Sequence, residues 1–271
     1  MKIDTLIFSG GGIKCLCLLG SLKYLIENDI IKEDLSTINT IICVSGGLIH
    51  ILPLILRYTI NEVLQTFFNY DYHKYINYDQ FEINGFLLNY GIFNNICNDN
   101  CEIFLKYKDL SVNITLKELY EKTKINLIVK VINLNKNEII YINYISHPDL
   151  YLKTLVTMTT NIPIFFKPIL YKDEYYIDGG VCGNFPIEAN KSKKYLGFNI
   201  CNNDTFTIHN ITDYLSSLFS MIGKEKIITD KRIINFTIDY QATDFNLTKK
   251  DKIKIIKEGY SQTEYFIKNY K

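Results

Sequence analysis

The sequence predicts an α/β protein in which helices cover both faces of a parallel or mixed sheet. Runs rich in β-branched and aromatic residues alternate along the chain with longer segments of helical periodicity. Tight, glycine-bearing turns join several of these strands to the next helix, which is typical of open α/β sheets. The chain has 271 residues and no linker-like segment, so we expect residues 1–271 to form a single domain.

The strands are predicted from short apolar runs that glycine, proline or polar turn residues interrupt. Two of these runs flank NLNKNE and two flank Lys172-Asp173, and we expect a hairpin at each place. The predicted strands are residues 3–8, 38–44, 127–133, 138–144, 169–171, 174–177, 195–200 and 233–238.

The helices are predicted from apolar residues at helical spacing, and three of them begin at a capping box. Pro53 is expected to end or kink the helix that follows residue 47. The capping boxes are Thr59-x-x-Glu62, Thr115-x-x-Glu118 and Thr248-x-x-Asp251. The predicted helices are residues 13–27, 48–55, 60–69, 115–122, 148–157, 212–222 and a C-terminal helix from residue 249.

The composition argues against several classes of protein. A net charge of +1 lacks the basic excess of a nucleic-acid-binding protein. The seven cysteines have no disulfide-framework spacing and indicate a reducing, cytoplasmic compartment. No His or Cys pair elsewhere in the sequence would complete a metal site with Cys97 and Cys101, so we expect no metal and no cofactor. We expect no signal peptide, and the longest apolar stretch, residues 37–56, is too interrupted to span a membrane.

The stretch IICVSGGL, residues 41–48, is the most suggestive of catalysis. A strand ends there and a helix begins with only Ser45 at the apex, so the turn must be sharp. Such a turn exposes the serine hydroxyl and points the helix amides at the atom that it attacks. The nucleophile-elbow pattern is G-x-S-x-G, and Cys43 replaces its first glycine. An ordinary Ser-Gly-Gly turn is the alternative.

Gly10, Gly11 and Gly12 connect the first strand to the first helix. Cys15 occupies the third glycine position of the dinucleotide-binding pattern, so that interpretation fails, and no Walker motif is present. What remains is an anion-binding turn at a helix N-terminus, suited to a phosphate or an oxyanion, which Lys14 is placed to assist. The alternative is a plain tight turn.

A third glycine-bearing turn, DGGVCGNFP, begins with Asp178 at the end of a predicted strand. Because the carboxyl ends of strands in an open α/β sheet gather at one edge, we expect Asp178 beside the two earlier turns. Asn184 is expected to order this loop. The alternative for Asp178 is a simple Asx turn, which is common for Asp-Gly.

A serine nucleophile needs a base, and the sequence favours Asp178 over a histidine. Only His209 follows Asp178 in the order that α/β-hydrolases use, and it has no clear strand-end context. We expect His50 to turn away from the apex, whereas His73 and His147 lie in polar, turn-like contexts. A carboxylate with a pKa near 4 is a weak base at neutral pH, so burial must raise this pKa or the dyad is slow.

The three turns together resemble the patatin-like phospholipase family. The family pattern is a GGGx[KR]G loop, then a GxSxG elbow, then a DG[GA] motif. This chain matches it with Gly10-Gly11-Gly12-Ile13-Lys14, Cys43-Val44-Ser45-Gly46-Gly47 and Asp178-Gly179-Gly180. Phrases such as YTINEVLQTFF and MTTNIPIFFKPI are also similar, so the likeness covers nearly the whole chain.

The resemblance implies a three-layer α/β/α fold and a lipid acyl hydrolase that needs no calcium. Ser45 would attack the ester carbonyl of a phospholipid or another acyl lipid, and Asp178 would accept and return the proton. The amides of Gly10, Gly11 and Gly12 would form the oxyanion hole, and water would hydrolyse the acyl-enzyme. The enzyme would contact membrane surfaces transiently. The supporting residues would be Lys14, Gly47, Gly179 and Gly180.

Two departures from the family pattern keep other functions open. Cys43 replaces the first glycine of the elbow and Cys15 the glycine after Lys14, which motivates a catalytically impaired lipid-binding or interaction module. An acyltransferase or thioesterase would use the same dyad with a different acyl acceptor. The dyad and the oxyanion glycines are intact, so we favour the hydrolase.

Two segments are candidates for lipid contact. The lysines between residues 249 and 257 could touch anionic lipid, although an ordinary solvated helix face is the simpler interpretation. The other candidate is the tyrosine- and asparagine-rich excursion that contains residues 70–93.

Overall fold

The computed structural model describes residues 2–70, 91–93, 101–201 except 103 and 107, and 227–269 except 245, together with residues 208, 214, 217, 218 and 221. Three of the expectations above fall largely or wholly outside these ranges. They are the aromatic excursion of residues 70–93, the helix at 212–222, and the contexts of Cys97, His73 and His209.

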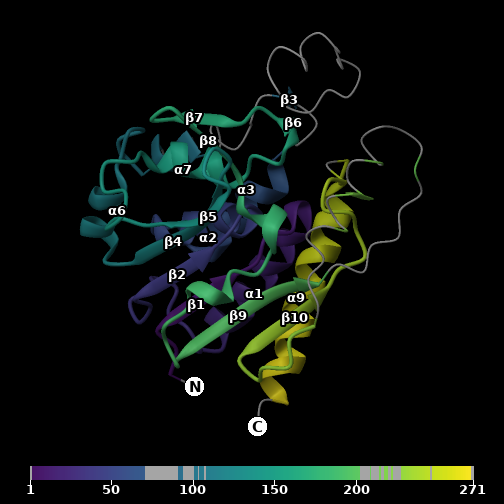
Figure 1. Ribbon diagram of the computed structural model, residues 1–271. Coiled ribbons are helices and arrows are strands. Elements are labelled where there is room, and N and C mark those ends of the chain that lie inside the picture. The colour runs from purple at the N-terminus through teal and green to yellow at the C-terminus, as the bar shows by residue number, and fades with distance from the viewer. Residues whose placement is uncertain are drawn as a thin grey trace.

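Within the described residues, eight strands form one mostly parallel sheet at the centre of the fold (Figure 1). These strands are β1 (Thr5–Phe8), β2 (Thr40–Cys43), β4 (Asn126–Asn133), β5 (Glu138–Ile142), β7 (Ile169–Tyr171), β8 (Glu174–Asp178), β9 (Tyr195–Cys201) and β10 (Ile233–Thr237). The order is β10-β9-β1-β2-β4-β8-β7, and β5 also pairs with β4. The first five strands of this order are parallel, whereas β5 and β8 are antiparallel to β4. Strands β3 (Gly91–Phe93) and β6 (Ile164–Phe166) form a separate small sheet.

Four of the described helices pack against one another in a single layer. They are α1 (Leu16–Glu27), α2 (Gly46–Ile55), α3 (Ile60–Asn69) and α9 (Lys249–Lys268). Figure 1 shows α9, near the C-terminus, running alongside α1. The remaining helices are α6 (Leu116–Thr123), α7 (Leu152–Thr159) and the short 3₁₀ helices η1 (Gly12–Cys15), η4 (Gly179–Cys182) and η5 (Ile187–Ala189).

Helices α1 and α9 touch backbone to backbone because each has a glycine at the contact. A Cβ on Gly20 would lie 1.8 Å from the Ile256 carbonyl oxygen, and a Cβ on Gly259 would lie 1.9 Å from that of Cys17. Any larger residue at either position would force these two helices apart.

Alternation along the strands sends side chains to two apolar clusters. Leu6 and Phe8 of β1 belong to the large core that the helices share, and Phe8 stacks on Phe198 at 4.5 Å between ring centroids. Ile7 points to the opposite face, into a smaller cluster that includes Phe185. The centre of the sheet is therefore covered on both sides, as the period-two pattern requires.

Most of the predicted elements are confirmed. All three capping boxes form, each with the threonine side chain accepting from the third helical amide, and both predicted hairpins are present. Helix α2 continues two residues beyond Pro53 before it ends at Ile55. Helix α7 starts at Leu152, four residues later than expected from Pro148.

One lysine of the C-terminal helix was misinterpreted. Lys252 is 4% exposed and its Nζ donates to the carbonyl oxygens of Phe67, Phe68 and Tyr70 at the end of α3. It therefore belongs neither to a solvated face nor to a lipid-contacting one.

Asp178 does not end a parallel strand, contrary to the expectation from the sequence, because β8 runs antiparallel to β4. Val131 pairs with both Asp178 and Ile140, so β8 and β5 occupy opposite edges of β4. Val129 pairs likewise with both β2 and β5, so β2 shares its edge of β4 with β8. The carboxyl ends of β2 and β8 therefore meet head-on along one edge of β4, at the level of Lys130.

Candidate active site

Ser45 sits at a strained strand-to-helix turn, as the elbow interpretation requires. Its backbone angles are φ 52° and ψ −131°, a region that residues with a side chain rarely adopt. The residue is 8% exposed, between the end of β2 and the first residue of α2. A serine held in this conformation at a buried turn indicates that the surrounding contacts fix its geometry.

A threonine that the sequence analysis did not single out stabilises this turn. The Ser45 main-chain N–H donates to Thr159 Oγ1 at 2.9 Å, and the Thr159 hydroxyl donates to the Lys130 carbonyl oxygen at 3.0 Å. Thr159 is completely buried at the end of α7. Small polar residues before Pro163 were the only signal of it in the sequence.

The two glycines after Ser45 allow the elbow to touch the first glycine turn. A Cβ on Gly47 would lie 2.5 Å from the Ser9 carbonyl oxygen. A Cβ on Gly46 would lie 2.9 Å from Cys15 Sγ and 3.0 Å from the Gly12 carbonyl oxygen. Gly46 and Gly47 therefore keep the candidate nucleophile in direct contact with the candidate oxyanion loop.

The two cysteines that replace family glycines fit their positions. Cys43 is the last residue of β2 and Cys15 precedes α1 with φ −59°, and neither has a positive φ. Both are completely buried, and burial raises the pKa of both thiols well above the usual range. They behave as small apolar residues, so the departure from glycine introduces no backbone strain.

Asp178 meets Ser45 at the junction of β2 and β8. The Ser45 side chain lies close enough to the Asp178 carboxylate to lower its pKa, and the Gly180 N–H donates to Asp178 Oδ1 at 2.7 Å. Asp178 is 4% exposed. The Asx turn, which the sequence offered as the alternative to a catalytic role for Asp178, is therefore present together with the contact to Ser45.

Burial raises the pKa of Asp178 to about 7. The hydrogen bonds from Ser45 and Gly180 and the positive charge of Lys130 oppose this rise, because each of them favours the ionised carboxylate. The condition set by the sequence is therefore met, since a carboxylate with this pKa is a competent base near neutral pH.

In the first glycine turn, the Gly10 amide already has a main-chain hydrogen-bond partner. The Gly10 N–H donates to the Asn184 carbonyl oxygen at 2.9 Å. Within the described residues, no main-chain hydrogen bond engages the amides of Gly11 or Gly12. Gly12 has φ +54°, and a Cβ there would lie 2.0 Å from the Ala242 carbonyl oxygen, so only glycine is accommodated.

Asn184 joins the first and third turns, as its expected ordering role suggests. A Cβ on Gly10 would lie 2.7 Å from Asn184 Oδ1 and 3.1 Å from Ser45 Cβ. A Cβ on Gly180 would lie 2.4 Å from the same Oδ1 atom. The three glycine-bearing turns predicted from the sequence therefore converge around Ser45, with the Asn184 side chain between two of them.

The other predicted supporting residues are also buried. Gly179 lies against β4, since a Cβ there would be 2.6 Å from the Lys130 carbonyl oxygen. Lys14 is fully buried in η1, and its charge acts on the neighbouring Cys15 thiol by lowering its pKa. A supporting role for Lys14 in anion binding stays a prediction.

The two described histidines have partners other than the serine. His50 Nδ1 lies 2.7 Å from the Gly46 carbonyl oxygen, and its ring stacks on Phe67 at 4.7 Å between centroids. Burial lowers the pKa of His50 to about 4, so the ring is neutral at pH 7 and Nδ1 donates to that carbonyl. His147 Nδ1 contacts Ser146 Oγ at 3.0 Å.

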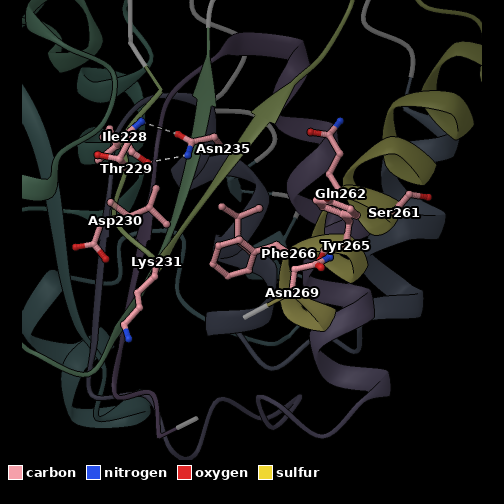
Figure 2. A pocket seen from close by; sticks show the side chains of 12 residues that line it. Ile228, Thr229, Asp230, Lys231, Asn235, Ser261, Gln262, Tyr265, Phe266 and Asn269 are labelled. Atoms are coloured by element: carbon pink, nitrogen blue, oxygen red, sulfur yellow. Dashed lines mark hydrogen bonds between the residues drawn. The ribbon is translucent and has the colours of Figure 1, made fainter. Parts of the chain in front are cut away.

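A groove of about 740 Å³ lies elsewhere, between β10, the segment that precedes it and the last turns of α9 (Figure 2). Asn235 holds that segment through two hydrogen bonds with the Ile228 main chain, drawn as dashed lines. The segment precedes a strand parallel to β1 and β2, so it lies at their amino ends, whereas Gly10 and Ser45 follow their carboxyl ends. This groove is therefore separate from the candidate active site.

No helix in the described ranges is long and apolar enough to cross a membrane. Nor do the described residues contain a group of three or more His, Cys, Asp or Glu side chains placed to hold a metal ion.

The fold and the site place the chain among α/β proteins that carry a serine on a strand-to-helix elbow. Within this class the chain belongs to the patatin-like phospholipase family, whose family model matches residues 6–190. That range contains all three glycine-bearing turns. The family resemblance and the mostly parallel α/β fold predicted from the sequence are thereby confirmed.

Viral proteins are among the relatives by sequence. A probable lipid hydrolase of invertebrate iridescent virus 6 is 35% identical over 186 residues, which cover 68% of this chain and 62% of that protein. An uncharacterized protein of Acanthamoeba polyphaga mimivirus is 28% identical over 271 residues, covering 93% of this chain and 89% of its own. This chain thus spans less than two thirds of the iridescent-virus relative.

Solved bacterial proteins share the fold. VipD from Legionella pneumophila matches with a TM-score of 0.67 and 16% identity, over 100% of this chain and 67% of VipD. ExoU from Pseudomonas aeruginosa matches in its complex with SpcU with a TM-score of 0.56 and 11% identity, over 99% of this chain and 53% of the other. At such identities the likeness concerns the fold alone.

Proposed function

We propose that this chain is a lipid acyl hydrolase in which Ser45 is the nucleophile and Asp178 the general base. The observation that carries the proposal is the meeting of Ser45 and the buried Asp178 carboxylate where β2 and β8 end against β4, with a pKa of about 7 for Asp178. Membership of the patatin-like phospholipase family and the likeness to a probable lipid hydrolase support acyl lipids as the substrate class.

In the proposed reaction, Asp178 accepts the hydroxyl proton while Ser45 Oγ attacks the ester carbonyl carbon. The tetrahedral intermediate expels the alcohol part of the lipid, and the protonated Asp178 gives it the proton. A water molecule, deprotonated by Asp178, then attacks the acyl-enzyme and releases the fatty acid. One carboxylate thus acts as base and as acid in each half of the cycle, which a pKa near 7 permits.

The oxyanion hole is assigned to the amides of Gly11 and Gly12. Gly10 contributes differently, because its amide is engaged by Asn184 and its lack of a side chain gives Ser45 and Asn184 room. Preorganised main-chain donors of this kind contribute about 3 kcal/mol each to transition-state stabilisation.

The burial and relaxed backbone of Cys43 and Cys15 give no support to an impaired module. An acyltransferase or thioesterase would share the first half-reaction, and only the acyl acceptor would differ. Transient contact with a membrane surface, where acyl lipids reside, belongs to the same proposal.

Incubation with phospholipid vesicles tests the proposal. Wild type should release fatty acid, whereas Ser45→Ala and Asp178→Asn should lose at least about 10³-fold of the rate. Asp173→Asn is the matched control, since this exposed aspartate has φ 63°, which asparagine tolerates. Equal release from all four proteins would refute the dyad, and vesicle binding without release would favour the binding module. Transfer of the acyl group to an added alcohol or thiol at the expense of water would favour the transferase.

A further inference from the structure

Lys130 is a buried lysine in the middle of β4, at the point where β2 and β8 end. Its neighbours Val129 and Val131 pair with Cys43 and Asp178, so Lys130 lies at the junction that brings the serine and the aspartate together. The side chain is 2% exposed. A lysine within the apolar run LIVKVIN is the sequence signal of this position.

The main chain of Lys130 is linked to the nucleophile through one side chain. Its carbonyl oxygen accepts the Thr159 hydroxyl at 3.0 Å, and Thr159 Oγ1 accepts the Ser45 N–H at 2.9 Å. This chain of two hydrogen bonds holds the amide of a residue whose backbone is strained. Without Thr159, that buried N–H would lose its partner and the turn would be free to relax.

The side chain of Lys130 is linked to the base through the loop that follows it. Its Nζ donates to the carbonyl oxygens of Cys182 and Gly183, each at 2.9 Å, and forms an ion pair with Glu188 Oε1 at 3.1 Å. These three partners satisfy the three N–H donors of the ammonium group. The loop after Asp178 is thereby held against β4.

A buried ammonium group is costly, so its retention at this position calls for a reason. Burying a charge costs several kcal/mol, and an apolar side chain of similar length would fill the same volume without that cost. The apolar side chain would lack the hydrogen bonds that hold the loop after Asp178. It would also lack the positive charge that favours the ionised form of Asp178. Three groups lower the pKa of Asp178: the cation of Lys130, the hydroxyl of Ser45 and the amide of Gly180. The Asp178 carboxylate in turn raises the pKa of the Cys15 thiol.

We propose that Lys130 is a positioning residue that sets the separation of Ser45 and Asp178, through Thr159 on one side and the 179–183 loop on the other. The inference rests on the proposed function, because it assigns these two residues to one reaction. Lys130 and Thr159 touch neither the reacting atoms nor, in this mechanism, the substrate.

The test measures the rate of Ser45 modification by a fluorophosphonate in Lys130→Met, Thr159→Val and Thr159→Ser. Two variants with matched local chemistry serve as controls. Thr123→Val removes a buried threonine that likewise donates to a carbonyl (Leu119) and accepts a main-chain N–H (Ile125). Lys252→Met removes another buried lysine that holds main-chain carbonyls, at the end of α3.

Lys130→Met and Thr159→Val should slow labelling by about 10- to 100-fold, since a displacement near 1 Å costs about that much. Thr159→Ser, which keeps the hydroxyl, should stay within about fivefold of wild type. Both controls should lose thermal stability comparably and label within about twofold. In Lys130→Met the acid limb of the labelling profile should also move to higher pH, because the cation that favours ionised Asp178 is gone. Labelling of either main variant at the rate of its control would overturn the proposal.

A second measurement separates this proposal from the proposed function. If wild type neither labels nor releases fatty acid, the hydrolase proposal fails, and NMR then decides the positioning proposal without turnover. Amide exchange at Ser45 should be slow in wild type and Thr123→Val and at least tenfold faster in Thr159→Val. The ¹³C titration of Asp178 should show a higher pKa in Lys130→Met than in wild type or Lys252→Met. Unchanged exchange and an unchanged titration would refute it.

Discussion

Ser45 lies beside the Asp178 carboxylate and lowers its pKa, although β2, which precedes Ser45, and β8, which ends at Asp178, run in opposite directions. Strand β2 runs parallel to β4 along one of its edges, β8 runs antiparallel to β4 along the same edge, and both end at the level of Lys130. The candidate active site lies between these two strand ends. This arrangement explains how a carboxylate at the end of an antiparallel strand reaches a serine that follows a parallel one.

The pH dependence of the reaction should report Asp178. The carboxylate must be ionised to accept a proton, and burial raises its pKa to about 7. We therefore expect kcat/KM to rise about tenfold per pH unit below 7 and to level off above it. A pH–rate profile on a soluble ester checks this, and an acid limb near pH 4 would mean that Asp178 is not desolvated in solution.

The same carboxylate should make the fold less stable as pH rises. The pKa is 3.8 for a free side chain and about 7 in the fold, so between these values the folded state binds more protons than the unfolded chain. Stability should fall through this window by up to roughly 4 kcal/mol, and Asp178→Asn should remove the fall. Denaturation midpoints of both proteins at pH 5 and pH 8 measure the part of this fall that lies above pH 5, about 3 kcal/mol. A parallel pH dependence of the two proteins would contradict the burial of the charge.

A methyl group on Gly10 should disturb the site through Asn184. The new Cβ would lie 2.7 Å from Asn184 Oδ1 and 3.1 Å from Ser45 Cβ, so one of them must move. We expect Gly10→Ala to lose at least about tenfold in kcat, as displacement of the nucleophile requires. Adding Asn184→Ala should recover part of the loss, whereas additive losses in the double mutant would show that Asn184 is not the obstacle.

Restoring the family glycine at position 43 should weaken the protein without activating it. Cys43 is completely buried and has ordinary strand geometry, so Cys43→Gly leaves a small cavity and a looser unfolded chain. We expect a loss of about 1–3 kcal/mol in the free energy of unfolding. Activity should change by less than about threefold. A large gain in activity would show that the cysteine impairs the elbow.

Much of this site could be predicted from the sequence because it is local. The elbow, the first glycine turn and the Asp-Gly-Gly turn each combine a strand end with small residues, and a one-dimensional pattern reveals such combinations. Capping boxes predicted helix starts for the same reason. Long-range relations could not be read this way, since nothing near Asp178 specifies that β8 runs antiparallel.

Lys130 and Thr159 were missed for a related reason. Their hydrogen-bond partners lie far along the chain. Sequence periodicity therefore shows Lys130 only as a charged residue within an apolar strand, and Thr159 only as the last residue of a helix. The loss of the Gly10 amide to Asn184 likewise depends on a contact between the first and third turns. Such contacts become visible only when the strands are assembled.

The most direct measurement of the central claim is the site of covalent modification by a fluorophosphonate. Intact mass spectrometry followed by peptide mapping locates the adduct. The proposed dyad predicts one adduct per chain, on Ser45, formed in wild type and strongly slowed in Asp178→Asn. An adduct on another residue, or lipid hydrolysis that continues after Ser45 is fully modified, would contradict it.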